Sequence, residues 1–123
     1  MATEAEKVVT AFIDAWPRRD VEELLEFFTD DAVYHNIPMQ AARGKEAIRA
    51  VINMFLPMAK SVEFKILHTV ASGNVVMNER VDIFDLGGKK IELPVAGVFE
   101  VTGGKISAWR DYFDLATWTR QMA

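Results

Sequence analysis

The chain of 123 residues is long enough to bury a core but too short for two, so residues 1–123 are expected to form a single domain. Half of the residues are hydrophobic and none is cysteine, which excludes disulfides, thiolate metal sites and cysteine nucleophiles. The net charge is −4, and lysine and arginine are scattered along the chain. This pattern argues against a nucleic-acid surface and against a polybasic membrane anchor.

Targeting and membrane-spanning patterns are also missing from the sequence. The N-terminal residues have neither the basic start nor the apolar run of a signal peptide. No apolar stretch approaches the length of a membrane span. We therefore expect a soluble, cytoplasmic protein that acts on a small molecule.

Two amphipathic helices are predicted at the start of the chain. Thr3 and Glu6 form a capping box, and the apolar residues that follow recur at helical spacing. This helix is expected to end at Trp16, because a residue that precedes proline is pushed out of the helical region. Asp20 opens a second helix in the same manner, and residues 29–31 are expected to close it.

A short strand and a third helix follow. Residues 32–36 read as a strand that Pro38 ends, and their alternation places Tyr34 and Asn36 on one face. Beyond this strand, apolar residues return to helical spacing. They predict a helix from about Gly44 to Leu56.

The second half of the chain reads as strands joined by short connections that contain glycine, which is typical of successive antiparallel hairpins. Pro94 predicts a bulge or a local break in its strand. Asp114 is expected to cap a final helical turn or two at residues 115–122. The predicted strands span residues 62–71, 75–85, 90–101 and 106–113. This order of elements predicts an α+β fold in which helices cover one face of a bent sheet.

Two of these strands carry a candidate site. Arg80 and Asp82 share a strand face, and Asp111 can be aligned with them on a later strand. If the hairpins are tight, Arg80 lies opposite Val95, and Asp111 falls near Val95 or Gly97. Small residues between the two partners would leave room for their side chains to converge. Two carboxylates held close cannot both ionise cheaply, and an arginine can orient both. Such a pair would titrate as a unit, with one member as an acid and the other as a base.

The residues alone leave an alternative open. The same charges could form a cross-strand ion pair on a solvated sheet face, with Val81 and Ile83 on the core side. Tyr34 and Asn36 favour a site, because a phenol and a carboxamide two residues apart are suited to fixing a water next to a base. Tyr34 could instead be a packing residue, and Asn36 could initiate a turn.

Other chemistries find no support in the sequence. His35 and His68 are isolated from metal-ligand spacings, so both are expected to be structural and no metal site is predicted. There is no G-x-S-x-G elbow and no glycine-rich phosphate loop. Their absence removes the usual serine hydrolase, nucleotide and dinucleotide interpretations.

Three segments, Tyr34–Asn36, Asn78–Asp82 and Gly104–Asp114, resemble the limonene-1,2-epoxide hydrolase family, which lies within the NTF2-like, SnoaL-like cone folds. The resemblance covers nearly the whole chain. It implies a strongly bent, mixed but mostly antiparallel sheet covered by three to four helices. It also implies a homodimer.

The chemistry that this resemblance implies is a one-step hydrolysis, without a cofactor, of a small apolar epoxide to a vicinal diol. The epoxide would be of the limonene or cycloalkene type. Asp111 would be the general base on water, Asp82 the general acid and Arg80 the bridge between them. Tyr34 and Asn36 would help to position the water. Ring strain activates the epoxide carbon, but its oxygen leaves poorly unless it is protonated as the ring opens.

The resemblance also places eight residues near an apolar substrate cavity, and the natural substrate stays open. Two other functions fit the same pocket: an isomerase of the ketosteroid isomerase type, and a non-catalytic module that binds a small ligand. The eight residues are Ile13, Trp16, Phe55, Phe84, Leu93, Val95, Phe113 and Trp118.

Overall fold

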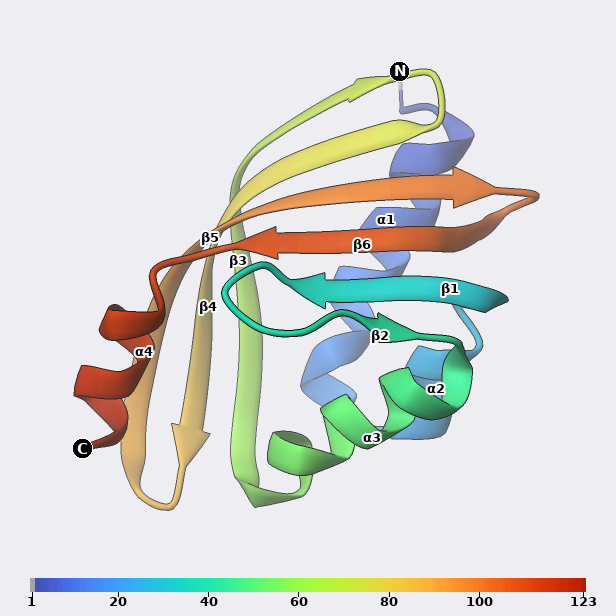
Figure 1. Cartoon of the computed structure of the whole chain (residues 1–123). Helices are drawn as coiled ribbons and strands as arrows, with labels where there is room; N and C mark the ends of the chain where they lie inside the picture. The colour runs from blue at the N-terminus through green and yellow to red at the C-terminus, as the bar shows by residue number, and fades with distance from the viewer. Residues whose placement is uncertain (1) are drawn as a thin grey trace.

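The computed structural model describes residues 2–123, and its centre is a strongly bent six-stranded sheet (Figure 1). The strand order is β2-β1-β6-β5-β4-β3, and every neighbouring pair is antiparallel except β1 and β6, which are parallel. The strands are β1 (Phe28–Asn36), β2 (Ala42–Arg43), β3 (Ala59–Ser72), β4 (Val75–Leu86), β5 (Lys89–Thr102) and β6 (Lys105–Tyr112). The helices are α1 (Glu4–Ala15), α2 (Val21–Leu25), α3 (Lys45–Phe55) and α4 (Leu115–Met122). The predicted α+β fold with a four-strand meander is confirmed.

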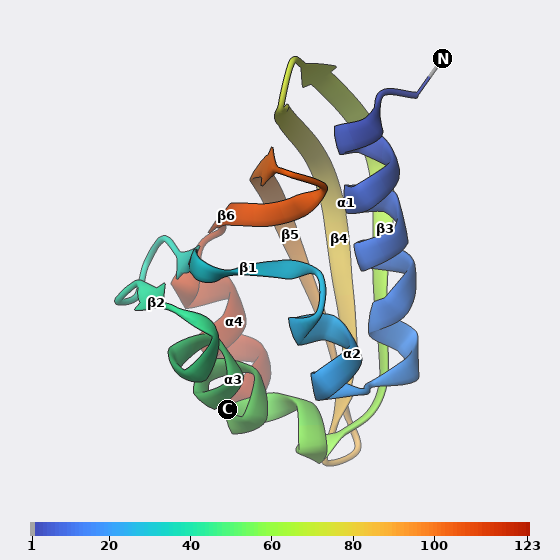
Figure 2. The same ribbon diagram turned by 90° about the vertical axis from the view of Figure 1, so that its right-hand side faces the viewer.

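The helices pack on the sheet at different places. α1 crosses β3 to β6, α3 packs on β1 and β2, and α4 packs on β5. Figures 1 and 2 show α2, α3 and α4 near one end of the long strands, with α1 running along them. The space between these helices and the concave face of the sheet is where a pocket can form.

The start of the chain follows its capping signals. The Thr3 hydroxyl accepts the backbone N–H of Glu6 at 3.1 Å, which completes the capping box of α1. α1 ends at Ala15, and a single 3-10 turn, Trp16–Arg18, carries the chain to Asp20. The Asp20 carboxylate then accepts the Glu23 N–H and caps α2. The predicted end of the first helix and start of the second are therefore confirmed.

The second helix is shorter than the sequence predicts. We expected residues 29–31 to close it, but α2 ends at Leu25 and β1 begins at Phe28. Phe28 is paired with Ile106 of β6, and the Ile106 N–H donates to the Phe27 carbonyl. Pairing with a strand distant in sequence thus overrides the local helical pattern. The two-residue strand β2 was not predicted at all.

Pro94 lies in β5 without the bulge or break that we expected, because pairing with β4 continues through Val81 and Pro94. The direction of the backbone explains this. The N–H and C=O of Glu92, two residues earlier, bond to the side chain of Gln121 in α4, on the edge of β5 away from β4. Alternate residues direct their backbone groups to the same edge, so the missing N–H of Pro94 removes no bond to β4.

An aromatic cluster joins α1 to the sheet. The Phe12 ring lies 5.0 Å from the Trp109 ring and 5.3 Å from the Phe28 ring, centroid to centroid, both edge to face. Phe12, Phe28 and Trp109 are fully buried. Burial and edge-to-face packing of this kind stabilise the joint between α1, β1 and β6.

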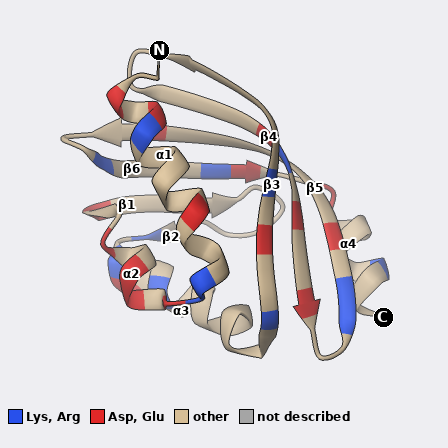
Figure 3. Cartoon of the chain, turned by 180° about the vertical axis from the view of Figure 1, so that it is seen from behind, with Lys and Arg blue, Asp and Glu red and all other residues tan. Residues whose placement is uncertain are grey.

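Charged residues are distributed over many elements. In Figure 3, segments with lysine or arginine and segments with aspartate or glutamate are spread over the helices and the strands. None of the helices between residues 2 and 123 is long and apolar enough to cross a membrane.

Candidate active site

Strand alternation brings the predicted charges together on the inner face of the sheet. Arg80 lies opposite Val95, and Asp111 lies opposite Gly97, as predicted. Arg80, Asp82 and Asp111 are 0%, 4% and 3% exposed. The alternative of an ion pair on a solvated face is therefore wrong.

A bulge in β6 decides which face Asp111 occupies. The turn pairs Thr102 with Lys105, and continuing that register would place Asp111 opposite Ala96, which is exposed on the outer face. The register shifts by one at Ser107, whose hydroxyl donates to the Glu100 carbonyl at 3.2 Å. This extra residue turns Asp111 to the inner face, because a shift of one residue exchanges the two faces of a strand.

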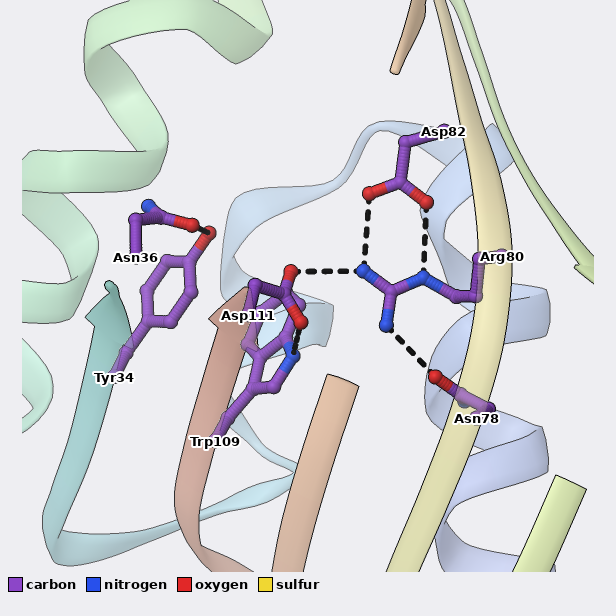
Figure 4. A network of polar contacts seen from close by, with 7 residues as sticks. All are labelled: Tyr34, Asn36, Asn78, Arg80, Asp82, Trp109 and Asp111. Carbon is purple, nitrogen blue, oxygen red and sulfur yellow. Dashed lines mark hydrogen bonds and ion pairs between the residues drawn. The ribbon is translucent and has the colours of Figure 1, made fainter. Parts of the chain in front are cut away.

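The guanidinium of Arg80 bonds to three side chains (Figure 4). Its Nε and Nη2 donate to the two oxygens of Asp82 at 2.9 and 3.0 Å. Nη2 also donates to Asp111 Oδ2 at 2.8 Å, and Nη1 donates to Asn78 Oδ1 at 2.9 Å. The planar guanidinium therefore fixes both carboxylates relative to each other.

Trp109 holds the other oxygen of Asp111. The indole Nε1 donates to Asp111 Oδ1 at 2.6 Å, and the indole ring stacks on Tyr34 with a centroid distance of 4.2 Å. Asp111 thus has a donor on each oxygen, and its orientation is set by two neighbours on different strands.

Gly97 makes room for this arrangement. A Cβ at this position would lie 2.4 Å from Arg80 Nη1 and 2.9 Å from Asp111 Oδ1. Both distances are shorter than non-bonded contacts allow. The absent side chain is therefore what permits the guanidinium and the carboxylate to meet across β5.

Burial shifts the acid–base properties of the pair. Burial raises the pKa of Asp82 to about 6, although Arg80 opposes the rise. Burial also raises the pKa of Asp111, against the effects of Arg80 and of the Trp109 hydrogen bond. Because the two carboxyls share one guanidinium, they titrate as a coupled pair. Burial lowers the pKa of Arg80, but the two carboxylates raise it above its ordinary value, so Arg80 stays charged.

Tyr34 and Asn36 lie on the Asp111 side of the guanidinium (Figure 4). Asn36 is directly opposite Asp111 in the parallel β1–β6 pair, and the Tyr34 hydroxyl donates to Asn36 Oδ1 at 3.2 Å. Burial, with the nearby Asp111 charge, raises the pKa of the Tyr34 phenol above its usual range, so the hydroxyl keeps its proton. The predicted five residues are thus within one site.

The two histidines lie outside this cluster. The His35 ring bonds to the Met39 carbonyl at 2.8 Å, and His68 pairs with Glu79 on the surface. Among residues 2–123, no group of three or more histidine or acidic side chains is arranged to hold a metal ion.

A cavity of about 270 Å³ opens beside the cluster. Of the eight residues expected to line it, Ile13 and Trp16 do not: both are buried in the core, 3% and 0% exposed. Their apolar helical stripe packs α1 on the sheet instead. The cavity is lined by six predicted residues, Phe55, Phe84, Leu93, Val95, Phe113 and Trp118, and by Tyr34, Asn36, Asp82 and Asp111. It is also lined by Met39, Val51, Met54, Met58, Phe64 and Leu115, which sequence reasoning did not identify.

Two residues around Arg80 had no predicted role. Asn78 lies two residues before Arg80 on the same strand face, and Trp109 has the same relation to Asp111. Period-two alternation could have identified both as neighbours of the charges. The role of Gly97 agrees with the prediction that a small residue between Arg80 and Asp111 leaves room for their side chains, and the register settles that this residue is Gly97 and not Val95.

Comparisons with known proteins identify the family of the chain. The family model of the limonene-1,2-epoxide hydrolase catalytic domain matches residues 3–123. The epoxide hydrolase EphG of Mycobacterium tuberculosis is 36% identical over 109 residues, which cover 87% of this chain and 71% of that protein.

Solved structures share the same fold. An M. tuberculosis LEH-like epoxide hydrolase superposes with a TM-score of 0.84 at 32% identity, covering 96% of this chain and 88% of that one. An NTF2-like protein of Burkholderia pseudomallei superposes with a TM-score of 0.88 at 17% identity over 99% of both chains, which shows the fold alone. The fold is thus the NTF2-like α+β fold expected from the sequence. With its matching family model and relatives, the chain belongs to the limonene-1,2-epoxide hydrolase family and is an epoxide hydrolase of that type.

Proposed function

We propose that the chain hydrolyses a small apolar epoxide to a vicinal diol in one step, with Asp111 as general base, Asp82 as general acid and Arg80 as the bridge. The observation that carries this proposal is a pair of buried carboxyls on one guanidinium at the wall of an apolar cavity. Both carboxyls line the cavity, so both can reach a bound substrate.

The positions of Tyr34 and Asn36 support the choice of Asp111 as the base. They lie beside Asp111, on its side away from Arg80, whereas Asp82 bonds to the adjacent edge of the guanidinium (Figure 4). A phenol and an amide beside a carboxylate can hold one water by hydrogen bonds. Asp111, Tyr34 and Asn36 together position the attacking water, and Asp82 faces the epoxide oxygen.

The proton transfers balance within the pair. Water loses a proton to Asp111 as the water oxygen bonds to one carbon of the epoxide ring. At the same time the bond between that carbon and the epoxide oxygen breaks, and the epoxide oxygen takes the proton of Asp82. The pair ends with the proton count with which it began, moved from one carboxyl to the other, and exchange then restores the starting state. Each well-placed transfer contributes on the order of a hundredfold to ten-thousandfold in rate.

The cavity lining supports a small apolar substrate. Its polar lining residues are Tyr34, Asn36, Asp82 and Asp111, and the other lining side chains are apolar. A limonene-type or cycloalkene epoxide would place its ring against the apolar side chains and its oxygen toward the carboxyls. The two proton transfers require no cofactor.

The first prediction concerns the two carboxyls. Asp82→Asn and Asp111→Asn should each lower kcat for cyclohexene oxide by about a hundredfold to ten-thousandfold, because each removes one proton transfer. The matched control is Glu79→Gln, which should retain activity. Glu79 lies on β4, as Asp82 does, but its side chain is exposed on the opposite face of the sheet. Diol formation is followed by gas chromatography. Full activity in either folded aspartate variant contradicts the proposal, and binding of apolar ligands without diol from any epoxide favours a ligand-binding module.

The second prediction is a pH profile limited on both sides. As the pH falls, a second proton enters the pair and the base is lost; as the pH rises, the shared proton leaves and the acid is lost. Burial raises the pKa of both carboxyls, that of Asp82 to about 6, so the high-pH limit lies at or above about pH 6. The measurement is kcat/KM for cyclohexene oxide across the range in which the protein stays folded, and a flat profile contradicts the assignment.

We also propose that the chain forms a homodimer through the outer face of the sheet. Val70 and Met77 oppose each other across β3 and β4 on that face and are 65% and 45% exposed. Exposed apolar patches of this kind often mark protein interfaces. Sedimentation equilibrium of the wild-type chain should give twice the 13.9 kDa chain mass, and the Met77→Glu variant should sediment with the mass of one chain. Thr10→Glu, exposed on α1 and away from the outer face of the sheet, is the control, and a wild-type monomer refutes the dimer.

A further inference from the structure

Asn78 completes the surroundings of the buried guanidinium. It is 4% exposed, and its Oδ1 accepts Arg80 Nη1 at 2.9 Å. Arginine can only donate, so the atom that faces Nη1 must be the amide oxygen. The amide nitrogen of Asn78 has no hydrogen-bond partner among residues 2–123. A buried donor without a partner lowers the stability of the fold, so any favourable contribution of this amide comes from its oxygen, which accepts the hydrogen bond from Arg80.

The charge of the cluster depends on this residue. Arg80 carries one positive charge, and Asp82 and Asp111 carry two negative charges when ionised. One proton therefore makes the buried cluster neutral. A carboxylate in place of Asn78 could make the same hydrogen bond, but it would add a charge and call for a second proton.

Among residues 2–123, no titratable group other than Asp82, Asp111 and Tyr34 is buried beside Asn78 and Arg80. β5 presents Gly97 to them, and β3 presents Phe64, whose ring centroid lies 5.1 Å from Arg80 Cζ. The buried residues of α1 are all apolar. On β1 and β6 the buried titratable groups are Tyr34, which keeps its proton, and Asp111 itself.

We propose that Asn78 is a positioning residue that holds the third edge of Arg80 without adding charge, and so limits the buried cluster to one exchangeable proton. The inference rests on the proposed acid–base function of Asp82 and Asp111. It adds a reason for the neutral amide: the general acid and the general base need one proton between them. Asn78 does not line the cavity, so it acts through Arg80 and not on the substrate.

Two variants of similar shape separate the charge from the contact. Asn78→Asp keeps an acceptor and adds a charge, whereas Asn78→Leu removes the acceptor and adds none. Asn53→Asp, exposed on α3, adds the same charge at a distance and is the control. Each chain is measured as kcat and KM for cyclohexene oxide against pH, and its aspartate carboxyls are titrated by 13C NMR.

The two variants should differ in kind. Asn78→Asp should move both limits of the pH profile upward by about one pH unit or more, because a nearby negative charge favours the protonated forms. Asn78→Leu should lower kcat about tenfold or more while KM and the pH limits stay, because Arg80 loses one of its three anchors. Asn53→Asp should match the wild-type chain.

Either variant can overturn the inference. If the pH limits and the carboxyl titrations of folded Asn78→Asp coincide with those of the wild-type chain, Asn78 does not set the proton count. If Asn78→Asp fails to fold, wild-type kcat in Asn78→Leu rejects the positioning role by itself. Absence of diol from the wild-type chain counts against the proposed function alone, because the NMR titrations test Asn78 without turnover.

Discussion

The buried guanidinium of Arg80 is the interaction on which the rest of the site depends. A charge can be fully buried only when it is paired and hydrogen-bonded, and here two carboxylates and one amide meet that need. Removing any partner leaves part of a charge uncompensated in an apolar interior. The same pairing holds the two acids of the proposed reaction at a fixed relative position, so a condition for stability also organises the site.

The fold supplies the positions that this interaction requires. The β6 bulge at Ser107 turns Asp111 inward, and Gly97 leaves the space across which it reaches Arg80. The parallel pairing of β1 with β6 brings Asn36 opposite Asp111, far from it in sequence. The bend of the sheet and the helices around its end then form an apolar cavity in which the pKa of both carboxyls rises.

Local signals in the sequence predicted most of this arrangement, and nonlocal contacts decided the rest. Strand alternation and glycine turns were enough to place Arg80 opposite Val95, because a short hairpin fixes its own register. The start of β1 at Phe28 was missed, since pairing with β6 sets it. The unbroken strand at Pro94 depends on which edge its nitrogen faces, and the burial of Trp16 depends on how α1 packs. None of these is visible in a local pattern.

The measurement that tests the central claim most directly is a single turnover of cyclohexene oxide in oxygen-18 water, with the diol analysed by mass spectrometry. If Asp111 activates water for direct attack, the diol of the first turnover carries solvent oxygen. If a carboxylate attacks the ring and forms an ester, the first diol carries unlabelled oxygen from the protein. Labelled diol in the first turnover is the result that the account predicts, and unlabelled diol would contradict it.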